Sequence, residues 1–156
     1  MIVVSNSSPL IAFAELEQLE LFPSVFSSIV IPPAVAREIA PSILTLPRWL
    51  RVEPLKTPLP ERVVRPSLGG GERETLAIAL EIQADRILLD DRIARRAADE
   101  LRLVVTGTVG VLLAAKRHGS IHRVRPLVDL LVQKSFFVGP ELYAEILRLA
   151  GEQDAG

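Results

Sequence analysis

Short apolar runs alternate with amphipathic segments along most of the chain. The runs at residues 1–4, 28–31, 86–89 and 103–105 predict buried strands, because they are rich in Val, Ile and Leu and end in polar or turn residues. Between and after them, apolar positions recur at helical spacing. This spacing predicts helices over residues 33–40, 72–83, 91–101, 108–117, 124–133 and 140–150.

Buried strands that alternate with helices are typical of a parallel sheet, because each pair of parallel strands needs a crossover and a helix supplies it. The pattern therefore predicts the α/β class: a three-layer α/β/α sandwich around a mostly parallel sheet of about four to five strands. A further helix is expected after the first strand, where Ser7 or Ser8 can cap it and Pro9 fits its first turn. A short helical piece is expected around residues 19–25.

Residues 41–68 interrupt this alternation. The segment is predicted to be an exposed, semi-rigid excursion, with one strand near residues 51–54. We interpret it as part of a single domain that spans residues 1–156, rather than as a linker between two domains. Its six prolines are Pro41, Pro47, Pro54, Pro58, Pro60 and Pro66.

Composition narrows the possible functions. The 156 residues are 49% apolar, which is enough for a full hydrophobic core, and the net charge of -1 gives no bulk basic field, so a nucleic-acid partner would need a local basic patch. The chain has no cysteine, which excludes disulfides, thiolate metal sites and a cysteine nucleophile. Its longest apolar stretch, residues 103–115, is too short to span a bilayer, and no signal peptide is evident. We therefore expect a cytoplasmic protein with no membrane partner.

Polar side chains follow three of the predicted strands, at the point where each strand ends. In open parallel sheets the carboxyl ends of the strands lie at one edge, and ligands bind there. We therefore expect the polar residues at these strand ends to converge. They are Ser5, Asn6, Asp90, Asp91, Thr106 and Thr108.

Two predicted helices can add carboxylates to this edge. Glu38 borders the apolar face of the helix over residues 33–40. On the helix over residues 72–83, at about 100° per residue, Glu72 falls inside the apolar arc and Glu74 falls on the polar arc. We therefore expect Glu72 to point inward and Glu74 outward.

An inward carboxylate needs a partner, because the burial of an unpaired charge is costly. Hard divalent cations such as Mg²⁺ or Mn²⁺ take oxygen ligands and can support phosphodiester hydrolysis, whereas His118 and His122 fit no ligand set. The residues of the right type for this are Glu38, Glu72, Asp90 and Asp91. Asp90 is the firmest of them, since it extends directly from a buried strand.

The other candidates also have purely structural interpretations. Asp91 can cap the helix that it precedes, and Glu72 can complement the partial positive charge of a helix N-terminus. Glu38 can pair with a nearby arginine, Asn6 can tie a turn, and Glu74 suits a solvated surface.

Basic and aromatic residues could contact a nucleic acid. Trp49 and Tyr143 could stack on bases, although core packing is the favoured interpretation, and the glycine run at residues 69–71 is interpreted as a flexible turn because it lacks the lysine of a phosphate-binding loop. Two basic clusters could hold phosphates or could equally be ordinary helix surface. They comprise Arg92, Arg95 and Arg96, and Lys116, Arg117, Arg123 and Arg125.

Five short motifs occur in order along the chain. They are Val3-Val4-Ser5-Asn6-Ser7-Ser8-Pro9-Leu10-Ile11, Ile31-Pro32 with Val35 and Glu38-Ile39, Gly71-Glu72-Arg73-Glu74, Leu88-Leu89-Asp90-Asp91-Arg92, and Thr106-Gly107-Thr108. Together they resemble the PIN-domain superfamily, in particular its branch of small prokaryotic PIN-like nucleic-acid-binding proteins. The resemblance has distinct motifs to about Gly119 and is looser beyond it.

The resemblance implies an α/β/α sandwich and a Mg²⁺- or Mn²⁺-dependent endoribonuclease that hydrolyses RNA phosphodiester bonds. It also implies single-stranded RNA as a substrate, a homodimer, and a role as the toxin of a toxin–antitoxin pair with an antitoxin protein as partner. The family's acidic positions correspond to Asn6, to Glu38, to Glu72 or Glu74, and to Asp90 or Asp91, and its threonine to Thr106 or Thr108. The candidate catalytic residues are therefore Asn6, Glu38, Glu72, Asp90, Asp91 and Thr106, and the resemblance adds Glu74 to the candidate metal ligands.

Asn6 departs from the family pattern, because an amide can donate an oxygen to a metal but adds no charge. Metal affinity and water activation should both weaken. A catalytically weak or inactive PIN-like module that binds RNA or protein is therefore the main alternative to the nuclease, and stabilisation by Mn²⁺ would separate the two. A nucleotide-binding α/β domain is less favoured, since no phosphate-binding loop is present.

Overall fold

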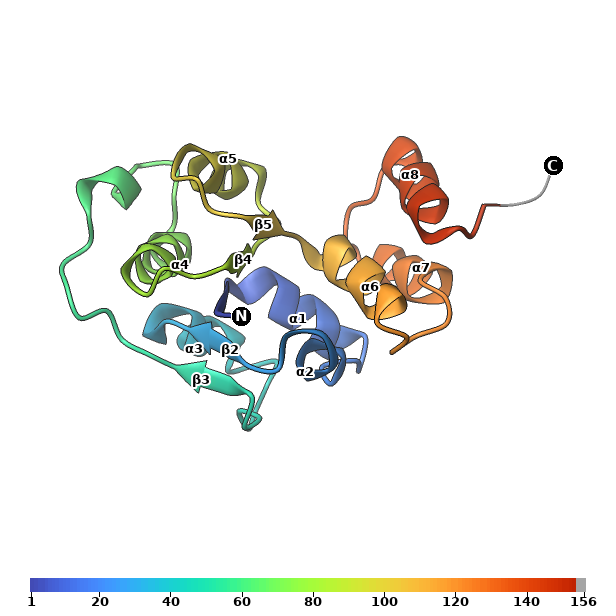
Figure 1. Ribbon diagram of the computed structural model, residues 1–156, viewed down its shortest axis with the longest axis horizontal. Coiled ribbons are helices and arrows are strands. Elements are labelled where there is room, and N and C mark those ends of the chain that lie inside the picture. Colours follow the sequence, from blue (N-terminus) through green and yellow to red (C-terminus); the bar gives the residue numbers. More distant parts are fainter. Residues whose placement is uncertain (154–156) are drawn as a thin grey trace.

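The structure, a computed structural model, describes residues 1–153 and contains a five-stranded sheet in which all neighbours are parallel. The strand order is β3-β2-β1-β4-β5, so β1 lies at the centre (Figure 1). The strands are β1 Val3–Ser5, β2 Ile29–Ile31, β3 Leu50–Val52, β4 Arg86–Leu88 and β5 Val105–Thr106. The predicted parallel α/β sheet is confirmed.

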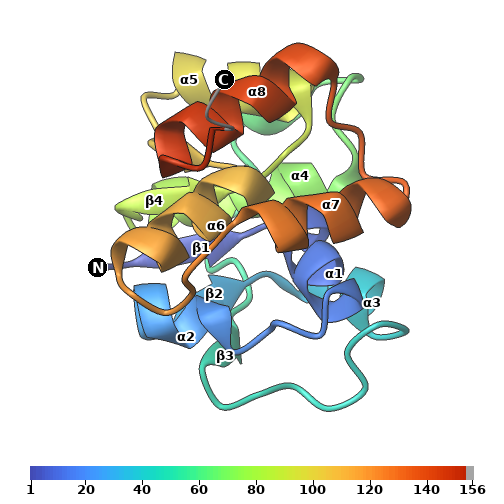
Figure 2. The same ribbon diagram turned by 90° about the vertical axis from the view of Figure 1, so that its right-hand side faces the viewer.

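Helices cover both faces of this sheet, which gives the expected three layers (Figures 1 and 2). One face is covered by α1 Ser7–Glu15, α2 Leu21–Phe26, α3 Pro33–Ile39, α6 Thr108–Arg117 and α7 Arg125–Gln133. The other is covered by α4 Gly70–Glu81, α5 Arg92–Glu100 and the short 3-10 helix η1 Glu61–Val63. The last helix, α8 Pro140–Ala150, packs against α6. Within residues 1–153, no helix combines the length and the apolar character needed to cross a membrane.

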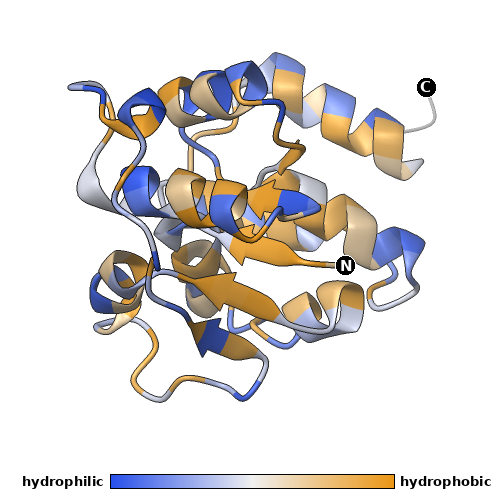
Figure 3. Cartoon of the chain, turned by 60° about the vertical axis from the view of Figure 1, so that its left-hand side comes forward, coloured by the Kyte–Doolittle hydropathy of each residue, from blue (hydrophilic) through white to orange (hydrophobic). Residues whose placement is uncertain are grey.

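Successive side chains of the central strands enter two different cores. Val3 and Leu88 pack with α1 and α6, whereas Val4 and Ile87 pack with α4 and α5. Neighbouring residues of a strand point to opposite faces of the sheet, so a strand that is covered on both faces must be apolar throughout. The hydropathy colouring shows this as a hydrophobic centre flanked by helices of mixed character (Figure 3).

The structure differs from the sequence-based elements most clearly at three places. Helix α4 begins at Gly70, so the prediction of a flexible turn over residues 69–71 was wrong for Gly70 and Gly71. β5 forms at Val105–Thr106, later than the predicted strand at residues 103–105, because Arg102 adopts a left-handed backbone (φ 61°) that delays the chain's entry into the sheet. The excursion over residues 41–68 contains the expected strand β3 and also η1, which the sequence did not predict. Val63 and Leu68 are buried against α4 and fix this part of the excursion to the core.

Glu152 connects the end of α8 to α6 and α7. Its carboxylate accepts hydrogen bonds from Nζ of Lys116 at 2.9 Å and from the backbone N–H groups of Val124 at 2.8 Å and Arg125 at 3.1 Å. The side chain is only 6% exposed. Burial alone would raise the pKa of Glu152, but the hydrogen bonds from Val124, Lys116 and Arg125 outweigh it and hold the pKa below the ordinary value of 4.5.

Replacing Glu152 by Gln removes the charge that neutralises Lys116 and leaves N–H donors at the start of α7 less well satisfied. We expect the free energy of unfolding to fall by about 2 kcal/mol and Tm by roughly 4–8 °C at neutral pH. Because the folded pKa lies below the unfolded one, this stabilisation is present above about pH 4.5 and is lost as the pH falls through the folded pKa. Thermal unfolding of both proteins between pH 7 and pH 3 should therefore show the two Tm values converging in acid.

Glu145→Gln is the matched control for this prediction. Glu145 also pairs with a basic residue, Arg148, but both side chains are about half exposed, at 47% and 55%. Solvated pairs of this kind contribute little to stability. A Tm gap for Glu152→Gln that stays constant from pH 7 to pH 3 would contradict the role assigned to its charge.

Candidate functional site

The carboxyl edge of the sheet brings the exits of β1, β4 and β5 together. Asn6 directly follows β1, and its backbone N–H donates to the carbonyl of Leu88, the last residue of β4, at 2.9 Å. Asp90 lies two residues further on, and it contacts Thr108 at the exit of β5. The expected convergence of Asn6, Asp90 and Thr108 at one edge is therefore observed.

Asp90 is held by both of its carboxylate oxygens. Oδ1 accepts from the backbone N–H of Thr108 at 2.7 Å, and Oδ2 accepts from the Thr108 hydroxyl at 2.6 Å. Thr108 begins α6, so the Asp90 charge lies at the positive end of a helix. Gly107 makes this approach possible, because a Cβ there would stand 2.9 Å from Oδ1 of Asp90. Asp90 is thus fixed in one orientation while remaining partly exposed.

Asn6 is buried, with 5% of its surface exposed. Its Oδ1 lies 3.5 Å from the hydroxyl of Thr75, which is at the outer limit for a hydrogen bond. The Thr75 hydroxyl donates its one hydrogen to the carbonyl of Gly71 at 2.6 Å instead. The amide oxygen of Asn6 therefore keeps the capacity to accept from another group.

Glu38 reaches the same edge from α3. Its Oε2 accepts from the hydroxyl of Ser7 at 2.6 Å, and its Oε1 lies 2.1 Å from the place that a Cβ on Gly71 would occupy. Although the residue as a whole is exposed, its carboxylate is lodged between the start of α1 and the start of α4. Asn6 and Glu38 therefore meet around Gly71, with Asn6 linked to it through Thr75.

Their angles on the helix predicted that Glu72 points inward and Glu74 outward, but the structure does not show this difference. Both are half-buried. The Glu72 carboxylate turns back to the N-terminus of its own helix, where a Cβ on Gly69 would stand 2.7 Å from Oε2. The expected outward orientation of Glu74 was wrong, because its Oε1 accepts from the backbone N–H of Ala34 at 3.3 Å. The first turn of α3 packs over this side of α4 and uses Glu74 to satisfy its N-terminus.

The side chains of Asp91 and Thr106 form hydrogen bonds with groups other than Asp90. Oδ2 of Asp91 accepts from the backbone N–H of Ala94 at 2.9 Å, which makes Asp91 the N-cap of α5, one of the two interpretations that the sequence left open. The Thr106 hydroxyl accepts from the Arg86 guanidinium. Of the two candidate threonines, Thr108 is therefore the one that contacts Asp90.

The oxygen atoms at this edge suit a hard divalent cation. Glu38 and Asp90 supply two carboxylates, and the side chain of Asn6 supplies a neutral oxygen, which is the donor chemistry of Mg²⁺ sites that retain several waters. Within the described part of the chain, no three His, Cys, Asp or Glu side chains are grouped closely enough to hold a metal ion. A cation here would therefore depend on the Asn6 amide, or on oxygens from a bound phosphate, in addition to the two carboxylates.

Sequence reasoning missed three residues that build this edge. Ser7 and Gly71 lie in the motifs that carry the family resemblance, but the sequence predicts no role for them beyond a helix cap and a flexible turn. Thr75 was not considered, although it is a polar residue within the buried arc of α4 and is completely buried. Such a polar residue on an apolar helix face was the one available signal, because buried hydroxyl groups need a partner.

Comparison with known proteins identifies the family and the fold. Residues 2–152 match the DUF3368 family of PIN domains. The fold is similar to that of a PilT N-terminus domain protein from the hyperthermophilic archaeon Sulfolobus solfataricus, with a TM-score of 0.58, and the aligned region covers 74% of this chain and 93% of that one. At 19% identity this likeness shows the fold alone. No curated protein is a significant match. Since the family match covers nearly the whole chain, the resemblance seen in the sequence is confirmed: the protein belongs to the PIN-domain family, whose fold is nuclease-like.

Proposed function

We propose that the protein is a divalent-metal-dependent nuclease that hydrolyses phosphodiester bonds of single-stranded RNA. The observation that carries the proposal is the pair of oriented carboxylates, Glu38 and Asp90, at the carboxyl edge of a PIN-domain sheet with Asn6 at the exit between them. Carboxylates alone would repel a phosphate, so an anionic substrate requires a cation between them. The oxygen-only donor set favours Mg²⁺ or Mn²⁺.

Each residue has its own role in this proposal. Thr108 orients Asp90, and Ser7 orients Glu38, so both carboxylates are positioned before a substrate arrives. Every carboxylate oxygen that accepts one hydrogen bond keeps a second lone pair for a cation. Asn6 adds a neutral oxygen. When bound, the metal would activate water for attack and stabilise the charge on the leaving oxygen.

Asn6 also favours a second candidate function, a PIN-like module that binds RNA or a protein with weak catalysis or none. A neutral amide contributes less to cation affinity than a carboxylate, and the described residues supply no group of three charged or imidazole ligands. The two candidates differ in a simple measurement. A nuclease site should raise Tm in millimolar Mn²⁺, whereas a binding module that uses its carboxylates only for structure should not respond.

Asp90→Asn should remove cleavage without unfolding the protein. Asn keeps an oxygen for the Thr108 N–H, and the Thr108 hydroxyl can turn to accept from the new amide, so the contact with α6 survives. We expect cleavage of a labelled single-stranded RNA in Mn²⁺ to fall by at least about 100-fold, the upper end of the loss for residues that merely support a ligand. Asp91→Asn is the control, because it keeps the cap of α5 and should leave the rate unchanged. Equal losses in both variants would contradict the choice of Asp90 over Asp91.

Asn6→Asp should restore a charge at the exit of β1. In EDTA we expect lower stability, by about 1–3 kcal/mol, because a buried carboxylate would lie near two others without a partner. In Mn²⁺ we expect a larger rise in Tm than for the unchanged protein, together with faster RNA cleavage. Gln133→Glu adds the same charge at an exposed position on α7 and should show neither effect. If Mn²⁺ stabilises Asn6→Asp no better than it stabilises the Gln133→Glu control, Asn6 does not lie at a cation site.

Gly71→Ala should disturb Glu38 specifically. The new Cβ would stand 2.1 Å from Oε1 of Glu38, so the carboxylate must leave its position and its hydrogen bond with Ser7. Because the displaced atoms are the end of a flexible side chain, stability should change little while RNA cleavage falls by about 10-fold or more. Gly70→Ala is the matched control, since a Cβ there meets nothing within 4 Å. Similar cleavage rates in the two variants would show that Glu38 is not part of the site.

A further inference from the structure

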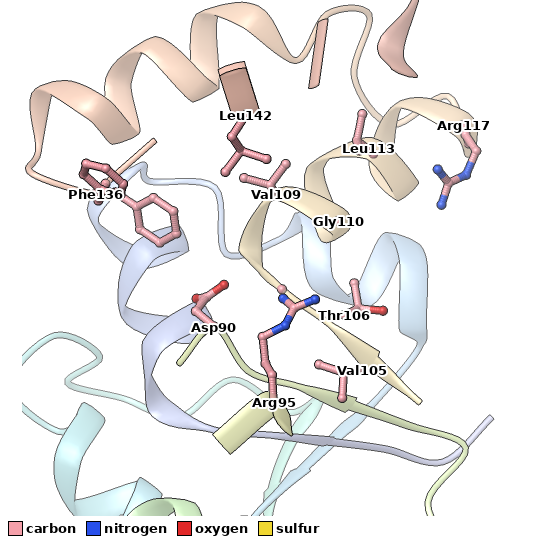
Figure 4. A pocket seen from close by; sticks show the side chains of 12 residues that line it. Asp90, Arg95, Val105, Thr106, Val109, Gly110, Leu113, Arg117, Phe136 and Leu142 are labelled. Carbon is pink, nitrogen blue, oxygen red and sulfur yellow. The ribbon is translucent and has the colours of Figure 1, made fainter. Parts of the chain in front are cut away.

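A cavity of about 480 Å³ opens beside Asp90, between the sheet edge and the C-terminal helices. Figure 4 shows the Asp90 carboxylate and the Arg95 guanidinium entering it from the side of the sheet, while Phe136 and Leu142 face them from the opposite wall. Its volume lies within the range of about 300–1,000 Å³ that is usual for ligand pockets. The cavity shares Asp90 with the candidate site, so a ligand here would lie next to the reacting bond.

The cavity contains two guanidinium groups, and one of them lies near Asp90: Nη1 of Arg95 and Oδ1 of Asp90 would stand 2.7 Å and 2.9 Å from a Cβ on Gly107. Arg95 on α5 and Arg117 on α6 both line it, and among residues 1–153 neither side chain forms an ion pair or a hydrogen bond. The neighbouring Lys116, by contrast, is neutralised by Glu152. The one carboxylate of the cavity, Asp90, already accepts two hydrogen bonds from Thr108. The cationic side of the cavity is therefore free to receive an anion such as a phosphate.

The opposite wall presents an exposed aromatic ring. The chain leaves α7 through Ser135, whose φ of 71° is left-handed, and the N–H of Phe136 donates back to the carbonyl of Leu131 at 2.9 Å. Phe136 is half-buried against the core and anchors this turn. Phe137 is then left 88% exposed while it lines the cavity. Gly139 at the start of α8 lies beside the Phe137 ring, 3.8 Å from it at the position of a Cβ.

We propose that this cavity is a nucleotide subsite for single-stranded RNA, in which Arg95 and Arg117 hold backbone phosphates and Phe137 stacks on a base. The proposal rests on the proposed function for its choice of RNA, and it names residues that lie outside the carboxylate site. Guanidinium groups suit phosphate oxygens, and an aromatic ring stacks on any base, since every base has a π-face. The two guanidinium groups therefore suit the phosphates of an RNA strand, and the exposed ring suits one of its bases.

The test of the subsite measures RNA binding rather than RNA cleavage, so that the result does not depend on the metal site. The probe is a fluorescein-labelled single-stranded RNA of about ten nucleotides, with binding followed by fluorescence anisotropy in EDTA over a range of salt concentrations. Arg95→Ala and Arg117→Ala should each reduce the slope of log K against log[salt] by about 0.7, the change expected for one lost phosphate contact on a single strand. Arg96→Ala, an exposed arginine on α5 that does not line the cavity, should not change the slope by this amount.

Phe137 has a different signature. Phe137→Ala should weaken binding by about tenfold and leave the salt slope unchanged, whereas Phe137→Trp should retain the affinity. An abasic oligonucleotide of the same length keeps the phosphates and removes the bases. The unchanged protein should bind it about tenfold less tightly than RNA, and Phe137→Ala should no longer distinguish the two probes.

Three results would overturn the subsite. The first is equal salt slopes for the arginine variants and Arg96→Ala. The second is equal discrimination against the abasic probe by Phe137→Ala and the unchanged protein. The third is a polyglutamate peptide that binds as tightly as the RNA with the same dependence on Arg95 and Arg117, because the cavity would then serve an acidic protein partner. Loss of cleavage in Asp90→Asn with unchanged RNA binding in EDTA would leave the subsite standing, so the two proposals can fail separately.

Discussion

Burial of the sheet on both faces is the constraint from which the rest of the structure follows. A strand covered by helices on either side has no place for a polar side chain in its interior, because an unpaired polar group there would be costly. Ser5, the last residue of β1, is completely buried and donates its hydroxyl hydrogen to the carbonyl of Asn6. Polar chemistry is therefore confined to the residues just beyond the strands, and parallel pairing places these residues at a single edge.

The contact between Asp90 and Thr108 explains how such an edge can hold a negative charge. The carboxylate accepts from the first residue of α6, where N–H groups are unsatisfied and the helix dipole favours an anion. The fold itself therefore holds the Asp90 carboxylate in one orientation. Asn6 is the N-cap residue of α1, but its side chain makes no capping hydrogen bond there; it is buried, with Oδ1 3.5 Å from the hydroxyl of Thr75. A neutral amide suits that environment better than a second carboxylate, unless a cation is bound.

Features that depend on a single helix or strand could be predicted from the sequence, whereas contacts between two elements could not. Apolar runs located β1 and β4, and residue type with position made Asp91 a candidate cap, because both follow from local rules. The orientation of Glu74 was wrong because helical angles describe one helix, whereas the partner of Glu74 is the backbone of Ala34 in α3. The choice between Thr106 and Thr108 likewise depended on a second element, because Thr108 begins α6 and contacts Asp90 only after the chain has left β5.

The carboxylates of the candidate site and the arginines of the neighbouring cavity carry opposite charges and lie close together at this edge. Glu38 and Asp90 favour a cation and disfavour a phosphate, whereas Arg95 and Arg117 do the reverse. A carboxylate at position 6 would strengthen cation binding, but it would also add to the negative potential that the proposed RNA substrate would have to approach. Asn6 lowers that potential while it keeps an oxygen directed to the edge. Under the proposed function, a site with a neutral residue here would depend more on the substrate's own phosphate oxygens to complete the cation's coordination, and metal binding would then be coupled to RNA binding at the neighbouring cavity.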